Sequence, residues 1–209
     1  MTATPWDERY RQGRDGWELG HPAPPLEAFL HSDRRAPQPP GQVLVPGCGR
    51  GHEAALLAER GFAVVGLDVS VEAIQRAQAL HGRDRAALRW VQADLLDPPA
   101  LAAAGLTDGS LQGVVEHTCF CAIDPAQRQA YLQTVVRLLQ PGGWLLGLFW
   151  CHQQPGGPPW GSDATTLAQQ LAAAGLQQQV WEPARGSAPN RDNEWLGVWR
   201  LPTPPATHL

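Results

Sequence analysis

The sequence lacks any run of about 20 apolar residues, the length that a helix needs to cross a membrane. Its polar start, residues 1–7, is not a signal peptide. Basic residues form no cluster, and the net charge is −4. We therefore expect a cytoplasmic protein whose partner is a small molecule, with neither nucleic acid nor a membrane as a partner. We also expect a monomer.

Sulfur-containing residues are few: the chain has four cysteines and one methionine. The cysteines do not have the spacing of a zinc site, so we predict reduced thiols and no bound metal. Cys48 and Cys151 are either packing residues or contacts to a ligand. Tryptophan, in contrast, occurs nine times, which is unusual for 209 residues.

The apolar pattern predicts one α/β domain. Short apolar runs alternate with helical patterns, which is typical of βαβ units and of a mostly parallel sheet with helices on both faces. We predict seven strands, the last one antiparallel, at 42–46, 62–68, 88–93, 111–118, 143–150, 176–182 and 194–200. Caps and glycine or proline stops predict helices at 52–60, 70–81, 124–139 and 162–174, with Asp124 and Ser162 beginning the last two.

Outside this pattern the chain is less regular. Residues 6–10 and 26–30 look helical, and the proline-rich segment 36–40 is an extended linker. We predict a loop with a short helix for residues 94–106. The single domain 1–209 is thus divided into an N-terminal lid and linker, a core and a flexible tail, at 1–40, 41–201 and 202–209.

A glycine-rich turn follows the first predicted strand. Gly47, Gly49 and Gly51 can adopt positive φ and let backbone N–H groups approach a ligand. Asp68 ends the next strand, where its carboxylate can accept the hydroxyls of a ribose. Because His52 occupies the last position of the G-x-G-x-x-G fingerprint, the spacing favours a nucleoside without phosphate, such as S-adenosylmethionine. An ordinary tight turn is the alternative.

Further polar and aromatic residues come at predicted strand ends. Parallel sheets bind ligands at the carboxyl ends of their strands, so we expect Asp94, His117 and Trp150 to line the same crevice as Asp68. Asp94 can accept the amine of an adenine on which Leu95 stacks. Alternatively, Asp94 only caps the turn that follows it.

Six motifs in this order make the chain resemble the thiopurine methyltransferase family, and especially its halide/thiol (thiocyanate) methyltransferase branch. They are Trp6-Asp7-Glu8-Arg9-Tyr10 with Gly16-Trp17-Glu18-Leu19-Gly20, Val43 to Glu53, Val65 to Ser70, Cys119-Phe120-Cys121-Ala122-Ile123-Asp124-Pro125, Leu139 to Gly143 and Gly156-Gly157-Pro158-Pro159-Trp160. The resemblance implies a Rossmann-like class I fold and a methyl transfer from S-adenosylmethionine to a small soft nucleophile.

The resemblance also implies the cofactor contacts, which are Trp6, Tyr10, Trp17, Gly47, Gly49, Asp68, Asp94, Leu95 and His117. If residues 5–17 were helical, Trp6, Tyr10 and Trp17 would share one face. Aromatic rings attract a sulfonium and exclude water from it, so these three predict a lid. Alternatively, they only attach the N-terminal segment to the domain, and both roles are compatible.

The chain departs from the halide/thiol relatives at three positions, with Tyr10 in place of a tryptophan and His117 and Trp150 in place of tyrosines. We predict catalytic roles for His117, as a base for a thiol, and for Trp150, whose indole donor suits an anion. A structural role for His117 is the alternative. The predicted substrate pocket comprises Trp17, Phe120, Trp150, Trp160 and Arg191, although Arg191 could instead pair with Asp192 or Glu194 at the surface.

The preferred function is therefore methyl transfer to a halide, thiocyanate, bisulfide or thiol by in-line displacement, without a metal. One alternative keeps the cofactor and changes the acceptor to a thiopurine, another aryl thiol or a metalloid such as tellurite. A second alternative is an NAD-dependent oxidoreductase or a nucleotide-binding module without catalysis. The G-x-G-x-G spacing and the aromatic residues before the first strand argue against the second alternative.

Overall fold

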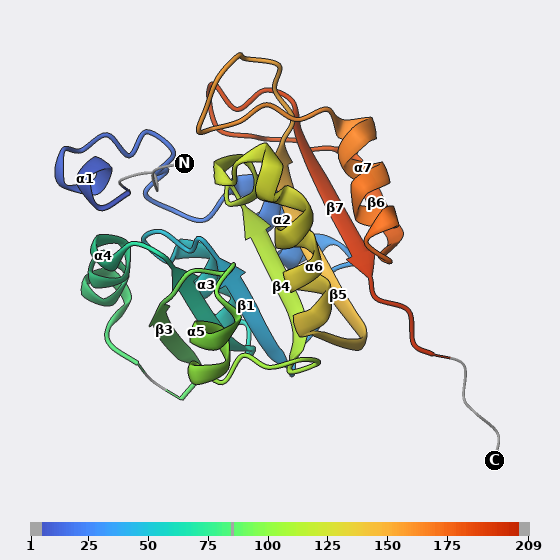
Figure 1. Cartoon of the computed structure of the whole chain (residues 1–209), viewed down its shortest axis with the longest axis horizontal. Helices are drawn as coiled ribbons and strands as arrows, with labels where there is room; N and C mark the ends of the chain where they lie inside the picture. The colour runs from blue at the N-terminus through green and yellow to red at the C-terminus, as the bar shows by residue number, and fades with distance from the viewer. Residues whose placement is uncertain (1–5, 85, 205–209) are drawn as a thin grey trace.

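The computed structural model describes residues 6–84 and 86–204 (Figure 1), so the ends of the predicted lid and tail, residues 1–5 and 205–209, lie outside the described residues. The centre of the fold is one seven-stranded sheet in the order β3-β2-β1-β4-β5-β7-β6. Its strands are β1 Gln42–Pro46, β2 Ala63–Asp68, β3 Leu88–Gln92, β4 Leu111–His117, β5 Leu139–Trp150, β6 Gln177–Pro183 and β7 Glu194–Arg200.

Strand direction determines which loops meet at one edge of the sheet. The pairs β1–β2, β2–β3, β1–β4 and β4–β5 are parallel, whereas β7 is antiparallel to both β5 and β6. The predicted seven strands and the antiparallel last strand are therefore confirmed. Because β7 runs in the opposite direction, the loop that precedes it lies at the same edge as the carboxyl ends of β1 to β5.

Helices cover both faces of the sheet, as predicted. Apolar residues of α2 Pro24–Ser32, α3 His52–Glu59 and α4 Val71–His81 pack into one core cluster. Those of α5 Pro98–Ala103, α6 Arg128–Leu138 and α7 Ala164–Ala173 pack into a second cluster. The strands β1 and β4 are buried along almost their whole length, because helices cover both of their faces. Within the described ranges, no helix is long and apolar enough to cross a membrane.

Two predicted helix starts differ from the structure. Asp124 accepts a hydrogen bond from Ala126 N at 2.9 Å, but it begins a 3₁₀ turn, η2 Pro125–Gln127, and α6 starts only at Arg128. At α7 the cap is Asp163 and not Ser162, because the Asp163 carboxylate accepts the N–H of Thr166 at 2.8 Å. The expected short helix within 94–106 is α5, which Asp97 caps.

The N-terminal segment contains the helix that the sequence predicts for residues 6–10. Helix α1 spans Trp6–Arg11 and packs against α4 (Figure 1), so Trp17 lies beyond the helix in an irregular segment. Residues 12–17 are not helical, so the condition under which the three aromatic residues would share one helix face is not met. The chain then continues through residues 18–23 into α2 and reaches the sheet through residues 33–41.

Candidate functional site

A cavity of about 570 Å³ lies at the carboxyl edge of the sheet. Segments that follow β1, β2, β3 and β4, the end of β5 and the loop before β7 line it, together with α1 and the segment after it. Nine of the residues predicted from the sequence contribute to this lining: Trp6, Tyr10, Trp17, Gly47, Asp68, Asp94, Leu95, Trp150 and Arg191. Gly49, His117, Phe120 and Trp160 do not line it.

The glycine turn after β1 has the predicted conformation. Gly47, Gly49 and Gly51 have φ of 55°, 54° and 82°, which side-chain-bearing residues rarely adopt. A Cβ at Gly47 would lie 2.9 Å from the Sγ of Cys119, and one at Gly51 would overlap the ring of Trp90. The turn therefore brings backbone to the cavity at a place where no side chain fits.

Asp68 connects this turn to the end of β2. One of its oxygens accepts the N–H of Gly49 at 2.9 Å, and the other accepts the N–H of Ser70 at 2.8 Å. Burial raises the pKa of Asp68, while these hydrogen bonds act in the opposite direction. Each oxygen keeps a second lone pair, and Asp68 lines the cavity, so the carboxylate can still accept hydroxyls from a ligand.

Asp94 makes the predicted turn contact and also lines the cavity. Its Oδ1 accepts the N–H of Leu96 at 2.8 Å, which is the local turn contact. The side chain nevertheless lines the cavity, next to Leu95, which is 5% exposed. The turn fixes the carboxylate at the cavity wall.

The aromatic residues of the N-terminal segment form a cluster although they share no helix. The ring of Trp17 meets the rings of Trp6 and Tyr10 edge-on, at centroid distances of 5.4 and 5.6 Å. The indole N–H of Trp17 also donates to the phenol oxygen of Tyr10 at 3.4 Å. The chain folds back after α1, and this reversal brings Trp17 to the helix.

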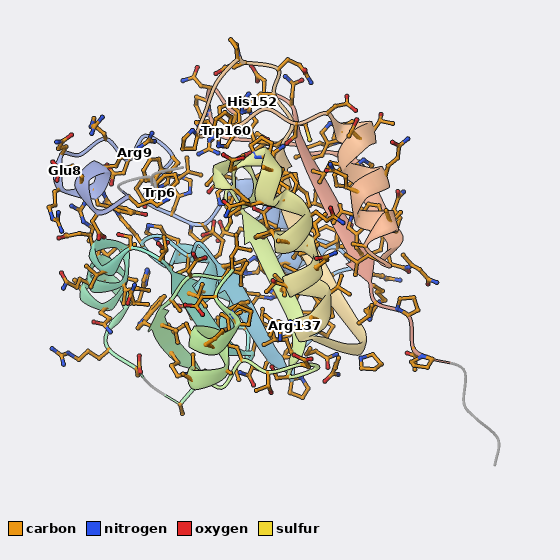
Figure 2. The ribbon with its side chains drawn as sticks, in the orientation of Figure 1. Trp6, Glu8, Arg9, Arg137, His152 and Trp160 are labelled. Atoms are coloured by element: carbon orange, nitrogen blue, oxygen red, sulfur yellow. The ribbon has the colours of Figure 1, made fainter. Side chains whose placement is uncertain are left out.

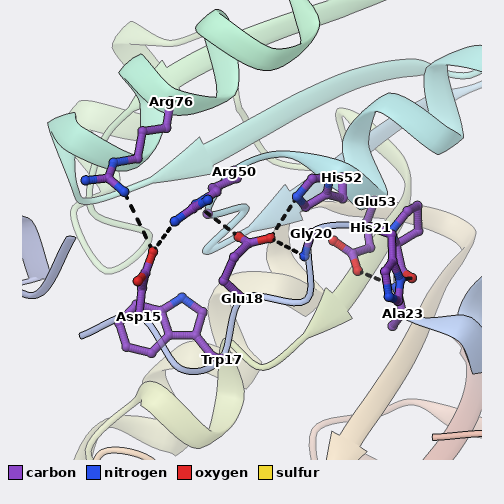
Figure 3. Close-up of polar contacts among 12 residues, drawn as sticks. Asp15, Trp17, Glu18, Gly20, His21, Ala23, Arg50, His52, Glu53 and Arg76 are labelled. Atoms are coloured by element: carbon purple, nitrogen blue, oxygen red, sulfur yellow. Dashed lines mark hydrogen bonds and ion pairs between the residues drawn. The ribbon is translucent and has the colours of Figure 1, made fainter. Parts of the chain in front are cut away.

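Polar contacts attach the same segment to the glycine turn and to α4 (Figure 3). Asp15 forms ion pairs with Arg50 and Arg76, and Glu18 contacts Arg50 at 3.4 Å and His52 at 2.8 Å. These contacts show that residues 6–23, which we call the strap, are attached to the domain. The strap also covers the cavity, so covering and attachment occur together.

His117, at the end of β4, points away from the large cavity. Its Nδ1 lies 2.9 Å from the carboxylate of Glu53, which also accepts the N–H of Ala23 at 3.0 Å. Burial opposes the charges of this pair, but their attraction is stronger: it lowers the pKa of Glu53 to about 2 and raises the pKa of His117. His117 and Gly49 line a neighbouring cavity of about 40 Å³ that shares Trp17, Leu19, Gly47 and Thr118 with the large one.

Arg191 is buried, with 6% of its surface exposed, and therefore is not the solvated loop residue of the alternative prediction. Its guanidinium donates to the backbone oxygen of Trp17 at 3.0 Å, lies 3.9 Å from Glu194 and stands 5.1 Å from the centroid of the Trp150 ring. The pairing with Glu194 thus exists, but in the interior. A positive charge consequently lines the cavity.

Trp150 contributes its ring and not its N–H. The indole N–H donates to the backbone oxygen of Asp192 at 3.0 Å. The prediction that this donor serves an anionic acceptor is therefore not supported by the structure. His152 packs against the Trp150 ring, at a centroid distance of 4.3 Å, and does not line the cavity.

Phe120 and Trp160 do not line the cavity but contact the segments around it. Phe120 is 2% exposed, packs against Tyr131 and Phe149, and donates its backbone N–H to Glu116 at 2.7 Å. Burial raises the pKa of Glu116 to about 7. Trp160 contributes backbone contacts that hold its loop in place.

The residues that sequence reasoning missed come mainly from the strap and from residues 118–123, which contain the turn η1 Phe120–Ala122. They are Arg9, Arg14, Leu19, Thr118, Cys119, Cys121, Ala122, Ile123, Gln154, Pro189 and Asn190. Thr118 has a φ of 60°, so the chain leaves the strand there and directs Cys119 and Cys121, and not Phe120, to the cavity.

Comparison with known proteins assigns this site to a family. A family model described as thiopurine S-methyltransferase matches residues 1–203. Thiocyanate methyltransferase 1 of Arabidopsis thaliana is 29% identical over 93% of this chain and 83% of its own length. Thiopurine S-methyltransferase of Pseudomonas fluorescens is 31% identical over 74% of each chain.

Solved structures support the fold. The structure of a Burkholderia thailandensis N1-methyltransferase with bound 1,6-didemethyltoxoflavin and S-adenosylhomocysteine has a TM-score of 0.71 and 21% identity, over 97% of this chain and 92% of that one. The predicted class I fold is therefore confirmed, and family membership decides against the NAD-dependent alternative. The chain belongs to the thiopurine S-methyltransferase family and is an S-adenosylmethionine-dependent methyltransferase.

Proposed function

We propose that this protein transfers a methyl group from S-adenosylmethionine to a small, soft, anionic nucleophile: a halide, thiocyanate, bisulfide or thiolate. The residues at the sheet edge fit the donor. Gly47 leaves room for backbone contact, Asp68 can accept ribose hydroxyls, and Leu95 offers an apolar face beside Asp94 for an adenine. Bound there, S-adenosylmethionine would supply a methyl group on its sulfonium. The nucleophile would bond to the methyl carbon in line as the carbon–sulfur bond breaks, with S-adenosylhomocysteine as the leaving group.

We choose an anionic acceptor because Arg191 places a buried positive charge at the cavity wall. Its contacts with the Trp17 carbonyl and the Trp150 ring fix the guanidinium at the cavity wall. In a site from which water is largely excluded, such a charge attracts an anion strongly and lowers the pKa of a thiol. We call the region bounded by Trp17, Trp150 and Arg191 the acceptor end of the cavity.

Methyl transfer mainly requires that the donor and the acceptor are aligned and that water is excluded from them. A halide, thiocyanate or bisulfide needs no deprotonation at neutral pH, so no acid–base pair is required. Trp6 and Trp17 cover the cavity with aromatic faces, which suit a cationic donor. His117 can serve as a base only for a protonated thiol, through its Nε2, because its Nδ1 is bonded to Glu53.

A planar aryl thiol is the second candidate acceptor. The specific observation in its favour is the three indole rings, of Trp6, Trp17 and Trp150, that line one cavity. Aromatic side chains stack on planar rings. A thiopurine methyltransferase is also among the relatives.

The test is a panel of acceptors at fixed S-adenosylmethionine, with release of S-adenosylhomocysteine as the measurement. The panel contains iodide, thiocyanate, bisulfide, an aryl thiol and tellurite. We expect turnover with thiocyanate or bisulfide at the largest kcat/KM. Turnover of the aryl thiol or of tellurite alone would overturn the assignment to a halide, thiocyanate, bisulfide or small thiolate.

A further inference from the structure

The acceptor end has two walls that come from distant parts of the chain. One wall is the turn after β4, which contributes Cys121, Ala122 and Ile123. The other wall is the loop between β5 and α7, residues 151–163, which contributes Gln154 and the pair Pro158 and Pro159. We call this second wall the outer loop. The distance between the walls determines how wide the acceptor end is.

Backbone contacts at Trp160 connect the two walls. Its N–H donates to the carbonyl of Cys121 at 2.6 Å, and its carbonyl accepts a hydrogen bond from Arg128 at 3.0 Å. The Trp160 ring lies over Gly157, where a Cβ would come within 2.4 Å of the indole. Trp160 therefore connects the outer loop to the turn after β4 and to α6.

Arg128 connects the outer loop to α6. It is the first residue of α6 and is only 8% exposed. Besides the Trp160 carbonyl, it donates to the carbonyl of Gly161 at 2.9 Å, and its guanidinium stands 4.6 Å from the centroid of the Phe120 ring. Within residues 6–84 and 86–204, no carboxylate lies within ion-pair distance of it.

These contacts need the planar fork of an arginine. The two terminal nitrogens reach two consecutive carbonyls while the flat face packs on an aromatic ring, which an ammonium group cannot reproduce. Both hydrogen bonds of Arg128 go to backbone carbonyls of the outer loop, and a lysine at this position keeps the positive charge while removing the fork. The effect of Arg128 is to fix the outer loop relative to α6 and to the turn after β4.

We propose that Arg128 is a positioning residue that sets the width of the acceptor end and thereby selects small acceptors over bulky ones. The inference rests on the proposed location of the acceptor. Arg128 itself does not line the cavity. Loss of its fork frees the outer loop, so that a small acceptor is aligned less well while a bulky one gains room.

The test compares Arg128→Lys with Arg137→Lys as the matched control. Arg137 lies near the other end of α6, as Figure 2 shows by its distance from Trp160, and pairs with Asp108 at the surface. For Arg128→Lys we expect KM for the small acceptor to rise about tenfold, which is the loss of about one charged hydrogen bond. We expect the dissociation constant of S-adenosylhomocysteine to stay within about twofold of wild type.

A second variant perturbs the same connection from the loop side. Gly157→Ala places a Cβ against the Trp160 ring and leaves α6 intact. Both variants should raise the ratio of kcat/KM for the aryl thiol to that for the small acceptor, whereas Arg137→Lys should not. This ratio separates positioning from simple loss of stability, which lowers both activities together.

The proposal is overturned if Arg128→Lys and Gly157→Ala leave acceptor KM and the selectivity ratio at wild-type values. A parallel loss of cofactor binding and of all acceptor activities in both variants also overturns it. The wild-type acceptor panel tests the proposed function separately. If that panel finds only a bulky acceptor, the anionic assignment fails, and the ratio between a bulky and a small acceptor analogue still tests Arg128.

Discussion

The two sides of the cavity are built in different ways. On the sheet side, polar groups are fixed by neighbours in the sequence: Asp68 by the N–H of Ser70, and Asp94 by the N–H of Leu96. On the acceptor side, Arg191 is held by the carbonyl of Trp17, 174 residues away in the sequence. The donor side is therefore a property of the strands and turns, whereas the acceptor side exists only when the strap and the loop before β7 have come together.

The largest effect is expected on the sheet side. Asp68→Ala removes the acceptor of the proposed ribose hydrogen bonds and leaves the N–H of Gly49 without its partner. We expect calorimetry to show at least about 100-fold weaker binding of S-adenosylmethionine, because such charged hydrogen bonds contribute about 1.5–3 kcal/mol each.

The control for this variant is Asp97→Ala, which removes the cap of α5 outside the cavity lining. It should cost about 1 kcal/mol of stability and leave the affinity for S-adenosylmethionine unchanged. Equal affinities of the two variants would contradict the proposed role of Asp68.

On the acceptor side, Arg191→Met should reduce kcat/KM for thiocyanate about 30-fold, since a close charge in a buried site is worth about 2 kcal/mol. Binding of S-adenosylhomocysteine should change much less. Arg185→Met, in the same loop and exposed, is the matched control. An equal loss for a neutral acceptor would show that Arg191 has only a structural role.

A substitution in the strap should have a smaller effect on ligand binding. Asp15→Asn removes the ion pairs to Arg50 and Arg76, and we expect S-adenosylhomocysteine to dissociate about threefold faster because partly exposed pairs contribute about 0.6 kcal/mol. The difference should shrink at high salt. The control is Glu8→Gln, which affects an exposed pair with Arg11. S-adenosylhomocysteine should dissociate from this variant at the wild-type rate. Rapid dilution of the labelled complex measures both rates.

A further effect concerns the pH dependence of stability. The lowered pKa of Glu53 stabilises the fold above its ordinary value of 4.5, and this contribution is lost as pH falls toward about 2. The raised pKa of His117 stabilises it below the ordinary value of 6.5, and this contribution is lost as pH rises through the raised value. The pair therefore contributes most between pH 4.5 and 6.5.

Glu53→Gln should flatten this dependence. The difference in melting temperature between wild type and variant should be largest in that window and fall by about 2–4 °C above it, which corresponds to about 1 kcal/mol. Thermal melts at several pH values measure the difference. A constant difference across the range would contradict the pairing of charged groups.

The same contrast explains what the sequence could predict. The glycine turn and Asp68 lie within one strand–helix–strand unit, so residue types and spacing were sufficient. Trp17 was identified through resemblance and Arg191 as a cation available to the acceptor, but their mutual contact depends on where β7 starts. The alternation after Thr118 could not be predicted, because a positive φ at a non-glycine residue leaves no clear sequence pattern.

The distribution of the tryptophans has an optical consequence. Trp6, Trp17 and Trp150 line the cavity, whereas Trp144 and Trp199 are each 1% exposed within the core. Emission from the first group responds to a bound ligand, while emission from the second changes only when the core opens. The unmodified chain therefore carries its own fluorescent reporters, with separate signals for occupancy of the site and for unfolding.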